Sequence, residues 1–160
     1  MGQYYKVVNT TKGQYLNPHT FGSGAKLMEF SSDGMSIMQG LAILLADGNN
    51  RGGGDLYSDN PLIGSWAGDS VVVTGDYADE GKFVPVKNRK ENLYKYAYDN
   101  YEDISEEVIC CLCEDKWWKQ EFYNQWKSQN FEDWNEERQH MKENLFGVRG
   151  CKMEMEGQDA

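Results

Sequence analysis

Glycine and tryptophan are distributed so unevenly that they divide this chain into two unlike halves. Of the 17 glycines in 160 residues, 14 precede residue 88, whereas four of the five tryptophans follow it. Glycine weakens helices and is common in turns, because it has no side chain to restrict the backbone. The first half therefore predicts short strands joined by turns, and the second half predicts helices rich in aromatic side chains.

The first half contains runs of residues that are typical of short β-strands. QYYKVVN and QYLNP flank a turn in which Gly13 supplies a positive φ, and this pattern predicts a hairpin. The three consecutive valines at 71–73 favour a strand covered on both faces, so we expect that strand at the centre of the sheet. The predicted strands are 3–9, 14–18, 25–30, 62–66, 70–76 and 82–86.

Helical periodicity appears once in the first half and throughout the end of the chain. Asp33 or Ser36 can cap a helix over about residues 34–46, and Asp103 and Asp115 can open two later ones. Together these patterns predict an α+β fold. In it, a mainly antiparallel sheet (residues ~3–86) contains one internal helix (~34–46), and C-terminal helices (~104–146) cover one face.

The length and the apolar pattern restrict the class of protein. A chain of 160 residues suits one domain, which we place at 1–150, followed by a flexible acidic tail at 151–160. The longest apolar run, 41–46, is far shorter than the roughly 20 residues of a membrane span. The first residues resemble no secretion signal, and the crowded cysteines suit a reducing compartment. We therefore expect a cytoplasmic protein with no membrane contact.

The charge is strongly negative and concentrated in the second half. The formal net charge is −10, and residues 88–160 hold 10 Lys and Arg against 17 Asp and Glu. Binding to nucleic acid requires a positive patch that neutralises phosphates, so nucleic acid is not an expected partner. Complementary fields favour a basic protein as the partner. The alternative is that the acidic surface only keeps the protein soluble.

The loop 47–59 shows no strand or helix signal and is the first candidate for a ligand site. Long loops in compact domains are usually functional or disordered. Three successive glycines can turn backbone N–H groups toward an anion, and the adjacent arginine adds positive charge. The candidate ligand-binding residues in this loop are Asp47, Asn49, Arg51, Gly52, Gly53, Gly54 and Asp55. A linker or a protein contact is the alternative, because neither a P-loop nor a complete calcium loop is present.

The acidic turn 75–83 adds Asp76 and Asp79 to the candidate ligand-binding residues. If this turn met Asp55 in the folded chain, the carboxylates would form a cluster suited to a cation or to acid–base chemistry. Aspartate is also common in solvated turns, and that interpretation is the simpler one.

No complete catalytic set is visible, and we expect no catalytic residue, resident metal or cofactor. His19 and His140 belong to no motif that pairs a base with a nucleophile. Cys110, Cys111 and Cys113 lack the matching second pair that a zinc site needs. We expect these thiols to pack inside the helical core.

Aromatic and acidic residues alternate in the segment 117–136. Trp118, Phe122 and Trp126 recur every four residues, which predicts that they share a core-facing side of one helix. Exposed aromatic residues among acidic ones are typical of the centres of protein interfaces. The predicted partner-binding residues are Trp117, Trp134, Glu121, Glu132, Asp133 and Glu136.

Two functional hypotheses follow. The first is a small acidic non-enzymatic binding protein that acts as an inhibitor or immunity-type protein on a basic partner, for example a nuclease or a defence enzyme. The alternative is an anionic small-ligand or nucleotide-binding protein or enzyme that uses the loop 47–59. A mimic of DNA fits less well, because ten basic residues are interleaved with the acidic ones in the second half.

Overall fold

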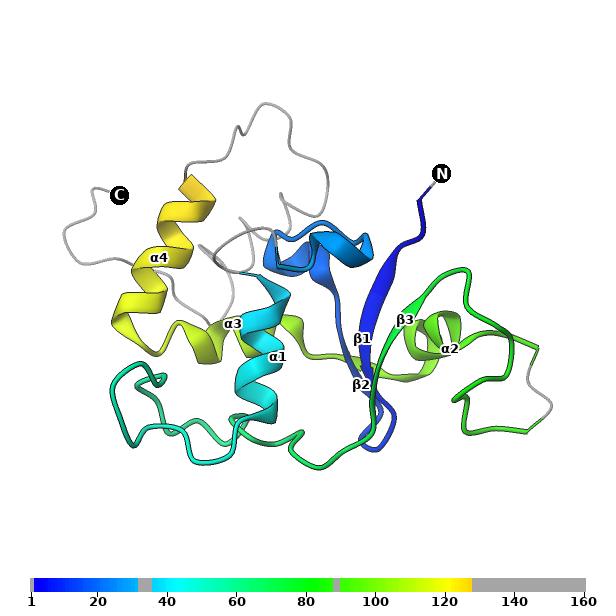
Figure 1. Cartoon of the computed structure of the whole chain (residues 1–160), viewed down its shortest axis with the longest axis horizontal. Coiled ribbons are helices and arrows are strands. Elements are labelled where there is room, and N and C mark those ends of the chain that lie inside the picture. Colours follow the sequence, from blue (N-terminus) through cyan, green and yellow to red (C-terminus); the bar gives the residue numbers. More distant parts are fainter. Residues whose placement is uncertain (1, 32–35, 88–89, 128–160) are drawn as a thin grey trace.

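The computed structural model describes residues 2–31, 36–87 and 90–127 and has an α+β fold (Figure 1). Its sheet contains β1 (Tyr5–Asn9), β2 (Gln14–Leu16), β3 (Val71–Gly75) and β4 (Glu102–Asp103) in the order β3-β1-β2-β4. β1 pairs antiparallel with β2 and β3, whereas β2 pairs parallel with β4. The sheet is therefore mixed but mostly antiparallel. The predicted first hairpin is confirmed, with Gly13 at φ 68° in its turn.

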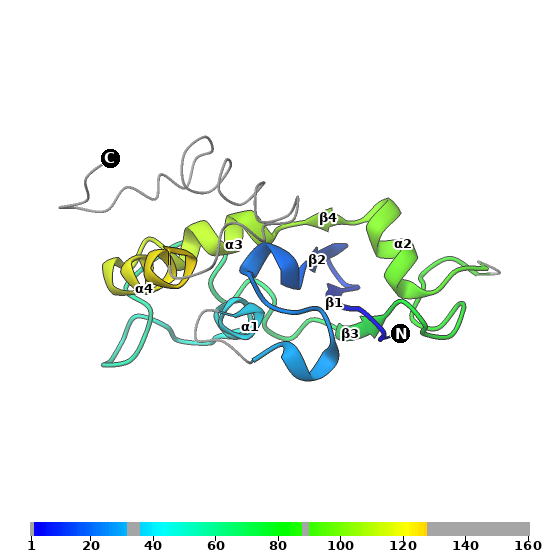
Figure 2. The same cartoon turned by 90° about the horizontal axis from the view of Figure 1, so that it is seen from above.

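Strand β1 is covered on both faces, because Lys6, Val7, Val8 and Asn9 are all buried. Successive side chains of a strand point to opposite faces. Val7 accordingly packs into the larger core, while Val8 joins a smaller cluster on the other side. Figure 2 shows α1 and α3 on one side of the strands and α2 on the other. Helices thus lie on both faces of the sheet rather than on one.

The internal helix α1 (Ile37–Leu45) begins where the sequence predicted it. Ser36 caps it by accepting a hydrogen bond from the Met38 N–H, and Gln39 accepts one from the Ser36 N–H. Ile37 and Leu44 are fully buried against the larger core. In Figure 1 this helix crosses in front of α3, and Figure 2 shows both helices on the side of the strands opposite α2.

Two further helices follow β4: α3 (Ser105–Leu112) packs against α1, and α4 (Lys116–Lys127) extends beyond α3, away from the strands (Figures 1 and 2). Ile104, at the start of α3, and Val108, Ile109 and Leu112 within it are buried. Asp115 opens α4 by accepting hydrogen bonds from two backbone N–H groups. The remainder of the predicted helical region, 128–146, and the predicted tail, 151–160, lie outside the described residues.

Three of the predicted strands are wrong. The run 62–66 forms turns, because the N–H groups of Gly64 and Trp66 donate to carbonyls in the last turn of α1 instead of to a neighbouring strand. The run 25–30 contains the short 3-10 helix η2 (Leu27–Glu29). The run 82–86 is not extended, since Phe83 has φ 64°, which no strand allows.

The valine-rich strand β3 is at an edge of the sheet and not at its centre. Val73 is 41% exposed, and within the described ranges β3 pairs with β1 and with no other strand. Branched side chains favour any strand position, so three consecutive valines do not distinguish an edge from a centre. The continuous burial expected for a central strand is found in β1 instead.

Helix α2 (Leu93–Asn100) was not predicted, although its sequence carries the signals. Asn92 caps it by accepting a hydrogen bond from the Lys95 N–H at 3.0 Å. Leu93 and Ala97, four residues apart, are buried beside Val8 and Tyr15 of the sheet. This helix covers the second face of the sheet and, as shown below, completes the candidate site.

Gly40 of α1 allows a close approach that a larger residue would prevent. A Cβ at this position would lie 2.8 Å from the Phe21 ring and 3.0 Å from Val108. Gly40→Ala is expected to destabilise the fold by roughly 1–3 kcal/mol through overpacking, despite the better helix propensity of alanine. Urea unfolding measures this free energy. Gly52→Ala is the control, because no atom lies within 4 Å of its added Cβ. Equal stability of Gly40→Ala and the wild type would contradict the packing described here.

Candidate functional site

Several polar side chains lie on the face of the sheet that α2 covers. Lys6 of β1 and Tyr15 of β2 are on the same face as Val8, because Val8 pairs with Tyr15 and strand residues alternate. Asp103 of β4 lies opposite Tyr15 in the parallel pairing. These side chains line a cavity of about 580 Å³ between the sheet and α2.

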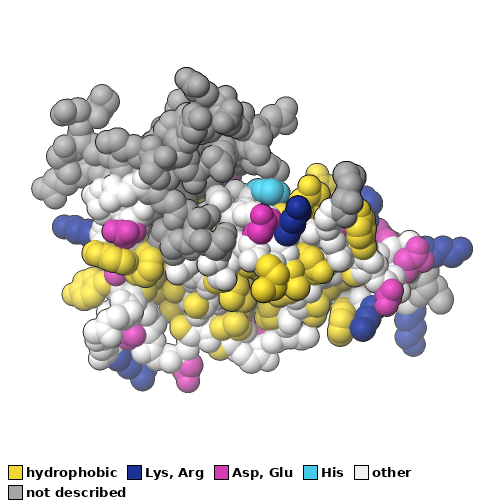
Figure 3. Space-filling model, turned by 45° about the horizontal axis from the view of Figure 1, so that its top comes forward, with side chains coloured by type: hydrophobic (Ala, Val, Ile, Leu, Met, Phe, Trp, Pro, Cys, Tyr) yellow, Lys and Arg dark blue, Asp and Glu magenta, His cyan; other side chains and the backbone are white. Residues whose placement is uncertain are grey.

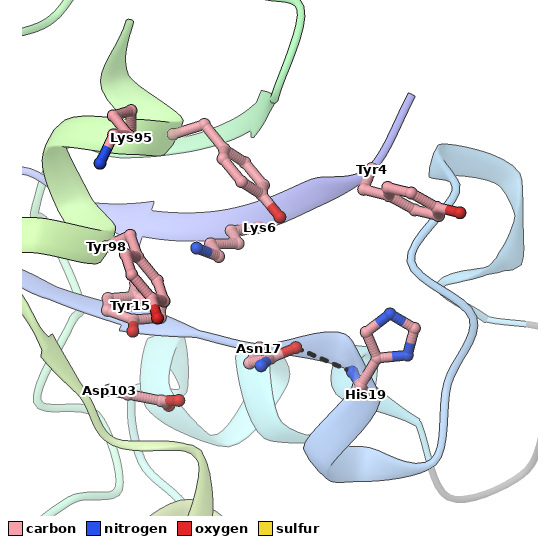
Figure 4. A pocket seen from close by; sticks show the side chains of 9 residues that line it. Tyr4, Lys6, Tyr15, Asn17, His19, Lys95, Tyr98 and Asp103 are labelled. Atoms are coloured by element: carbon pink, nitrogen blue, oxygen red, sulfur yellow. Dashed lines mark hydrogen bonds between the residues drawn. The ribbon is translucent and has the colours of Figure 1, made fainter. Parts of the chain in front are cut away.

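Two helical elements complete the walls of this cavity. Helix α2 contributes Tyr94, Lys95 and Tyr98, and the 3-10 helix η1 (Pro18–Phe21) contributes His19. Asn17 fixes the start of η1 by accepting a hydrogen bond from the His19 N–H at 3.0 Å (Figure 4). The full lining consists of Tyr4, Lys6, Tyr15, Asn17, His19, Tyr94, Lys95, Tyr98 and Asp103.

The Lys6 ammonium group lies among three tyrosine rings. Its Nζ atom is 4.0 Å from the ring centroid of Tyr94, 4.6 Å from that of Tyr98 and 5.0 Å from that of Tyr15. Figure 4 shows its side chain directed toward Tyr98 and α2. The electron-rich faces of the rings attract a cation. Among the described residues, no hydrogen bond or ion pair to the Lys6 side chain is found.

Burial changes the protonation of Lys6. The residue is 5% exposed, and desolvation lowers the pKa of its amine from 10.5 to about 8. Asp103, Asp99 and Asp76 oppose this shift, because their negative charges favour the ammonium form. A substantial fraction of neutral amine is therefore present in weakly alkaline solution.

The pKa of Lys95, the second lysine of the cavity, is raised and not lowered. Lys95 Nζ forms an ion pair with Asp99 Oδ2 at 2.8 Å, and this contact raises the pKa of Lys95. Burial raises the pKa of Tyr15 to about 12, so its phenol keeps its proton at physiological pH. The cavity thus combines one weakly basic amine, one ordinary ammonium group and a protonated phenol.

This arrangement can hold a small molecule that has both a ring and an oxygen acceptor. The tyrosine rings offer apolar surface for a planar group, and the N–H groups of Lys6 need an acceptor. In Figure 3 the cyan histidine, which is the one histidine in the described ranges, lies beside acidic, basic and hydrophobic side chains on the surface. The site is thus mixed in charge rather than uniformly positive.

The predicted glycine loop forms an anion nest, but the chain supplies its own anion. The N–H groups of Arg51 and Gly52 donate to Asp55 Oδ2 at 2.8 and 3.2 Å. Gly54 has φ 93°, as a tight loop requires. The carboxylate of Asp55 therefore occupies the position that we predicted for a ligand.

The rest of this loop is tied to the protein by side-chain hydrogen bonds. Asn49 accepts a hydrogen bond from the Leu56 N–H and donates to the Leu56 and Ser58 carbonyls. Asp115 accepts from the Tyr57 N–H, and Glu114 accepts from Ser58 Oγ, which fixes the loop to the α3–α4 junction. The exposed Asp47, Gly53 and Arg51 are in this loop as well.

The structure does not bring the acidic turn to the glycine loop. Figures 1 and 2 show the loop that contains Asp55 at one end of the long axis and the segment after β3 at the other. Asp76 is occupied locally, because its Oδ1 accepts a hydrogen bond from the Tyr4 N–H at 2.9 Å. Asp79 is exposed beside β3. Asp76 and Asp79 therefore do not form a carboxylate cluster with Asp55.

Two of the six predicted partner-binding residues, Trp117 and Glu121, lie within the described residues. Trp117 is 61% exposed, whereas Trp118 packs against the core, as expected. Glu121 is exposed on the same helix. Trp134, Glu132, Asp133 and Glu136 lie outside the described residues, and so does His140.

The cysteines agree with a packing role. Cys111 and Cys113 are buried in the core, and Cys110 is half-buried. Burial raises the pKa of the Cys111 thiol to about 12, so this thiol stays protonated. No group of three or more His, Cys, Asp or Glu side chains suited to a metal occurs in the described ranges.

Sequence reasoning missed the residues that form the cavity. Lys6 is a charged residue within the apolar strand YKVVN, and Tyr94 and Tyr98 share one helix face at a spacing of four. A buried lysine in a strand and a tyrosine pair on a helix are the signals that were available. Lys6 and the two tyrosines are close only because α2 covers the face of the sheet that carries Lys6, and the sequence does not specify which face α2 covers.

No protein-family profile, curated protein or solved structure matches this chain significantly. None of the helices in the described part of the chain is long and apolar enough to cross a membrane.

The lowered pKa of Lys6 predicts a specific change of stability with pH. Between pH 8 and 10.5 the unfolded chain binds this proton more strongly than the folded protein, so the Lys6 contribution to stability rises with pH. Relative to Lys6→Met, the wild type is therefore expected to gain stability from pH 7 to pH 10. Urea unfolding of both proteins at the two pH values measures the difference.

Lys95→Met is the matched control for this measurement. The pKa of Lys95 is raised, so the contribution of Lys95 to stability is lost only above the ordinary lysine pKa. The difference in unfolding free energy between the wild type and Lys95→Met is therefore expected to stay constant from pH 7 to pH 10. A constant difference for Lys6→Met as well would show that Lys6 is not desolvated.

Proposed function

We propose that this protein binds a small organic molecule in the cavity between β1 and α2. The observation that supports this most directly is Lys6, a residue that is 5% exposed and whose ammonium group opens onto the cavity with no hydrogen-bond acceptor among the described residues. Nearly all polar groups inside folded proteins are hydrogen-bonded, so an ammonium group that opens onto a cavity without a protein acceptor has room there for a partner. We assign that partner to a ligand.

The chemistry of the walls defines the ligand class. An oxygen acceptor, such as a carboxylate or a carbonyl oxygen, satisfies the donors of Lys6. A planar ring stacks on Tyr94 or Tyr98, whose rings lie within 5 Å of the Lys6 nitrogen. A cavity of about 580 Å³ suits a molecule of the size of common metabolites. The ligand is thus a small anionic aromatic molecule, as in our alternative hypothesis, but its site differs from the predicted loop.

A second candidate function is the binding of a basic protein, as an inhibitor or immunity-type protein would do. Trp117 supports it, because an indole that is 61% exposed costs free energy unless a partner covers it. Its ring lies edge-on to Trp118 at 4.6 Å, so it is already held in place for contact. The acidic second half of the chain favours a basic partner.

We place either function in the cytoplasm. Cys110, Cys111 and Cys113 are free thiols, and thiols persist in reducing compartments.

Native mass spectrometry tests these proposals on protein taken gently from its own host. We expect extra mass of a few hundred daltons in the native spectrum of the wild type, because the ligand stays bound in the cavity. Lys6→Met is expected to lose this mass. Arg51→Ala is expected to keep it, since Arg51 lies in the loop that Asp55 already occupies.

The outcomes separate the two functions. Extra small mass lost on Arg51→Ala but kept on Lys6→Met would contradict the cavity and return the site to the glycine loop. A stoichiometric basic protein with no small adduct would favour the second candidate. Trp117→Ala would then weaken binding by about 2 kcal/mol or more, roughly 30-fold.

A further inference from the structure

We infer that Lys6 binds its ligand covalently, as an imine formed between its amine and a carbonyl carbon of the ligand. This inference rests on the proposed function, because the ligand must first enter the cavity. It adds a chemical class to that function, namely aldehydes and ketones that carry a conjugated ring.

The position of the Lys6 amine favours nucleophilic attack. The residue is 5% exposed, it lines the cavity, and its nitrogen lies near the rings of Tyr94, Tyr98 and Tyr15. No carboxylate of the described residues forms an ion pair with it, so no such contact holds the amine in its charged form. Lys95 lines the same cavity but is paired with Asp99 at 2.8 Å. The two lysines therefore differ in the one property that nucleophilic attack requires.

Charged and titratable groups reach Lys6 from every element around it. Asp103 of β4, Asp99 of α2 and Asp76 after β3 favour its protonated form, and Lys95 disfavours it. The other titratable groups of the lining are Tyr4, Tyr15, His19, Tyr94 and Tyr98. Desolvation outweighs the three carboxylates, and the pKa of Lys6 falls to about 8. Enzymes activate nucleophilic lysines by the same means, through burial in an apolar pocket.

The reaction balances without any oxidant or reductant. The lone pair of Lys6 Nζ attacks the carbonyl carbon, and the carbonyl oxygen takes up protons and leaves as water. The nitrogen loses its two protons in the same overall step, and a carbon–nitrogen double bond replaces the carbon–oxygen double bond. Water in the cavity can supply the protons that the oxygen takes up, and Tyr15, which lines the cavity as a protonated phenol, can donate a hydrogen bond to the carbonyl oxygen.

A reducible aromatic aldehyde tests this inference. We would incubate the full chain with 4-formylbenzoate and sodium cyanoborohydride, which converts an imine into a stable secondary amine, and map the adducts by peptide mass spectrometry. At pH 8 we expect Lys6 to be labelled about tenfold faster than Lys95, because far more of its amine is neutral. The labelling rate at Lys6 is expected to level off above pH 8, while that at Lys95 continues to rise.

Two variants and one unreactive probe make the result decisive. Lys6→Arg keeps the positive charge and is expected to lose the selective adduct, whereas Lys12→Arg, at a lysine that pairs with Asp69 and does not line the cavity, is expected to keep it. Binding of 4-methylbenzoate, which has no carbonyl group, is measured separately by calorimetry and reports on the cavity alone. Selective labelling of Lys6 with these variant effects supports the inference.

The remaining outcomes overturn it in distinguishable ways. If 4-methylbenzoate binds the wild type but Lys6 is labelled no faster than Lys95, the imine is excluded and the binding function is retained. If neither probe binds and no lysine is labelled selectively, the inference fails together with the aromatic-carboxylate ligand that we proposed.

Discussion

The burial of β1 on both faces is the constraint on which the rest of the structure depends. Alternation along this strand sends Val7 into the larger core and Lys6 and Val8 toward α2. A strand enclosed in this way must place its charged residue inside the protein. The ammonium group loses water, and the tyrosine rings around it replace only part of the lost hydration. The loss of hydration of the ammonium group occurs beside a cavity, where a bound ligand can offset its free-energy cost.

Helix α2 both covers the sheet and shapes the site. Leu93 and Ala97 pack on Val8 and Tyr15, whereas Tyr94 and Tyr98, one position further along, line the cavity. The same helix supplies Asp99, which keeps Lys95 charged and leaves Lys6 without an ion pair among the described residues. The glycine loop, by contrast, satisfies itself, because Asp55 fills its nest and Asn49 fixes its ends. The glycines of this loop thus allow a turn in which the Asp55 carboxylate accepts the backbone N–H groups.

Local signals in the sequence were sufficient for the elements that depend on neighbouring residues. The hairpin around Gly13, the Ser36 cap of α1 and the Asp115 cap of α4 are examples, because each is decided within a few residues. The predictions failed where tertiary contacts decide. The run 62–66 donates hydrogen bonds to the last turn of α1 instead of forming a strand, and β3 lies at an edge of the sheet. Neither outcome can be predicted from the residues of the segment alone. The candidate site was missed for the same reason. Its residues come from β1, β2, β4, η1 and α2, and only the folded chain brings them together.

The most direct test of this account is an NMR titration of the Lys6 side chain, followed through the Cε resonance of isotopically labelled protein. The account predicts a midpoint near pH 8 for Lys6, because desolvation lowers its pKa to about 8. Lys95, paired with Asp99, is expected to titrate above the ordinary lysine value. If Lys6 titrated near 10.5, its ammonium group would be hydrated or paired in solution, and the assignment of the cavity as the functional site would be contradicted.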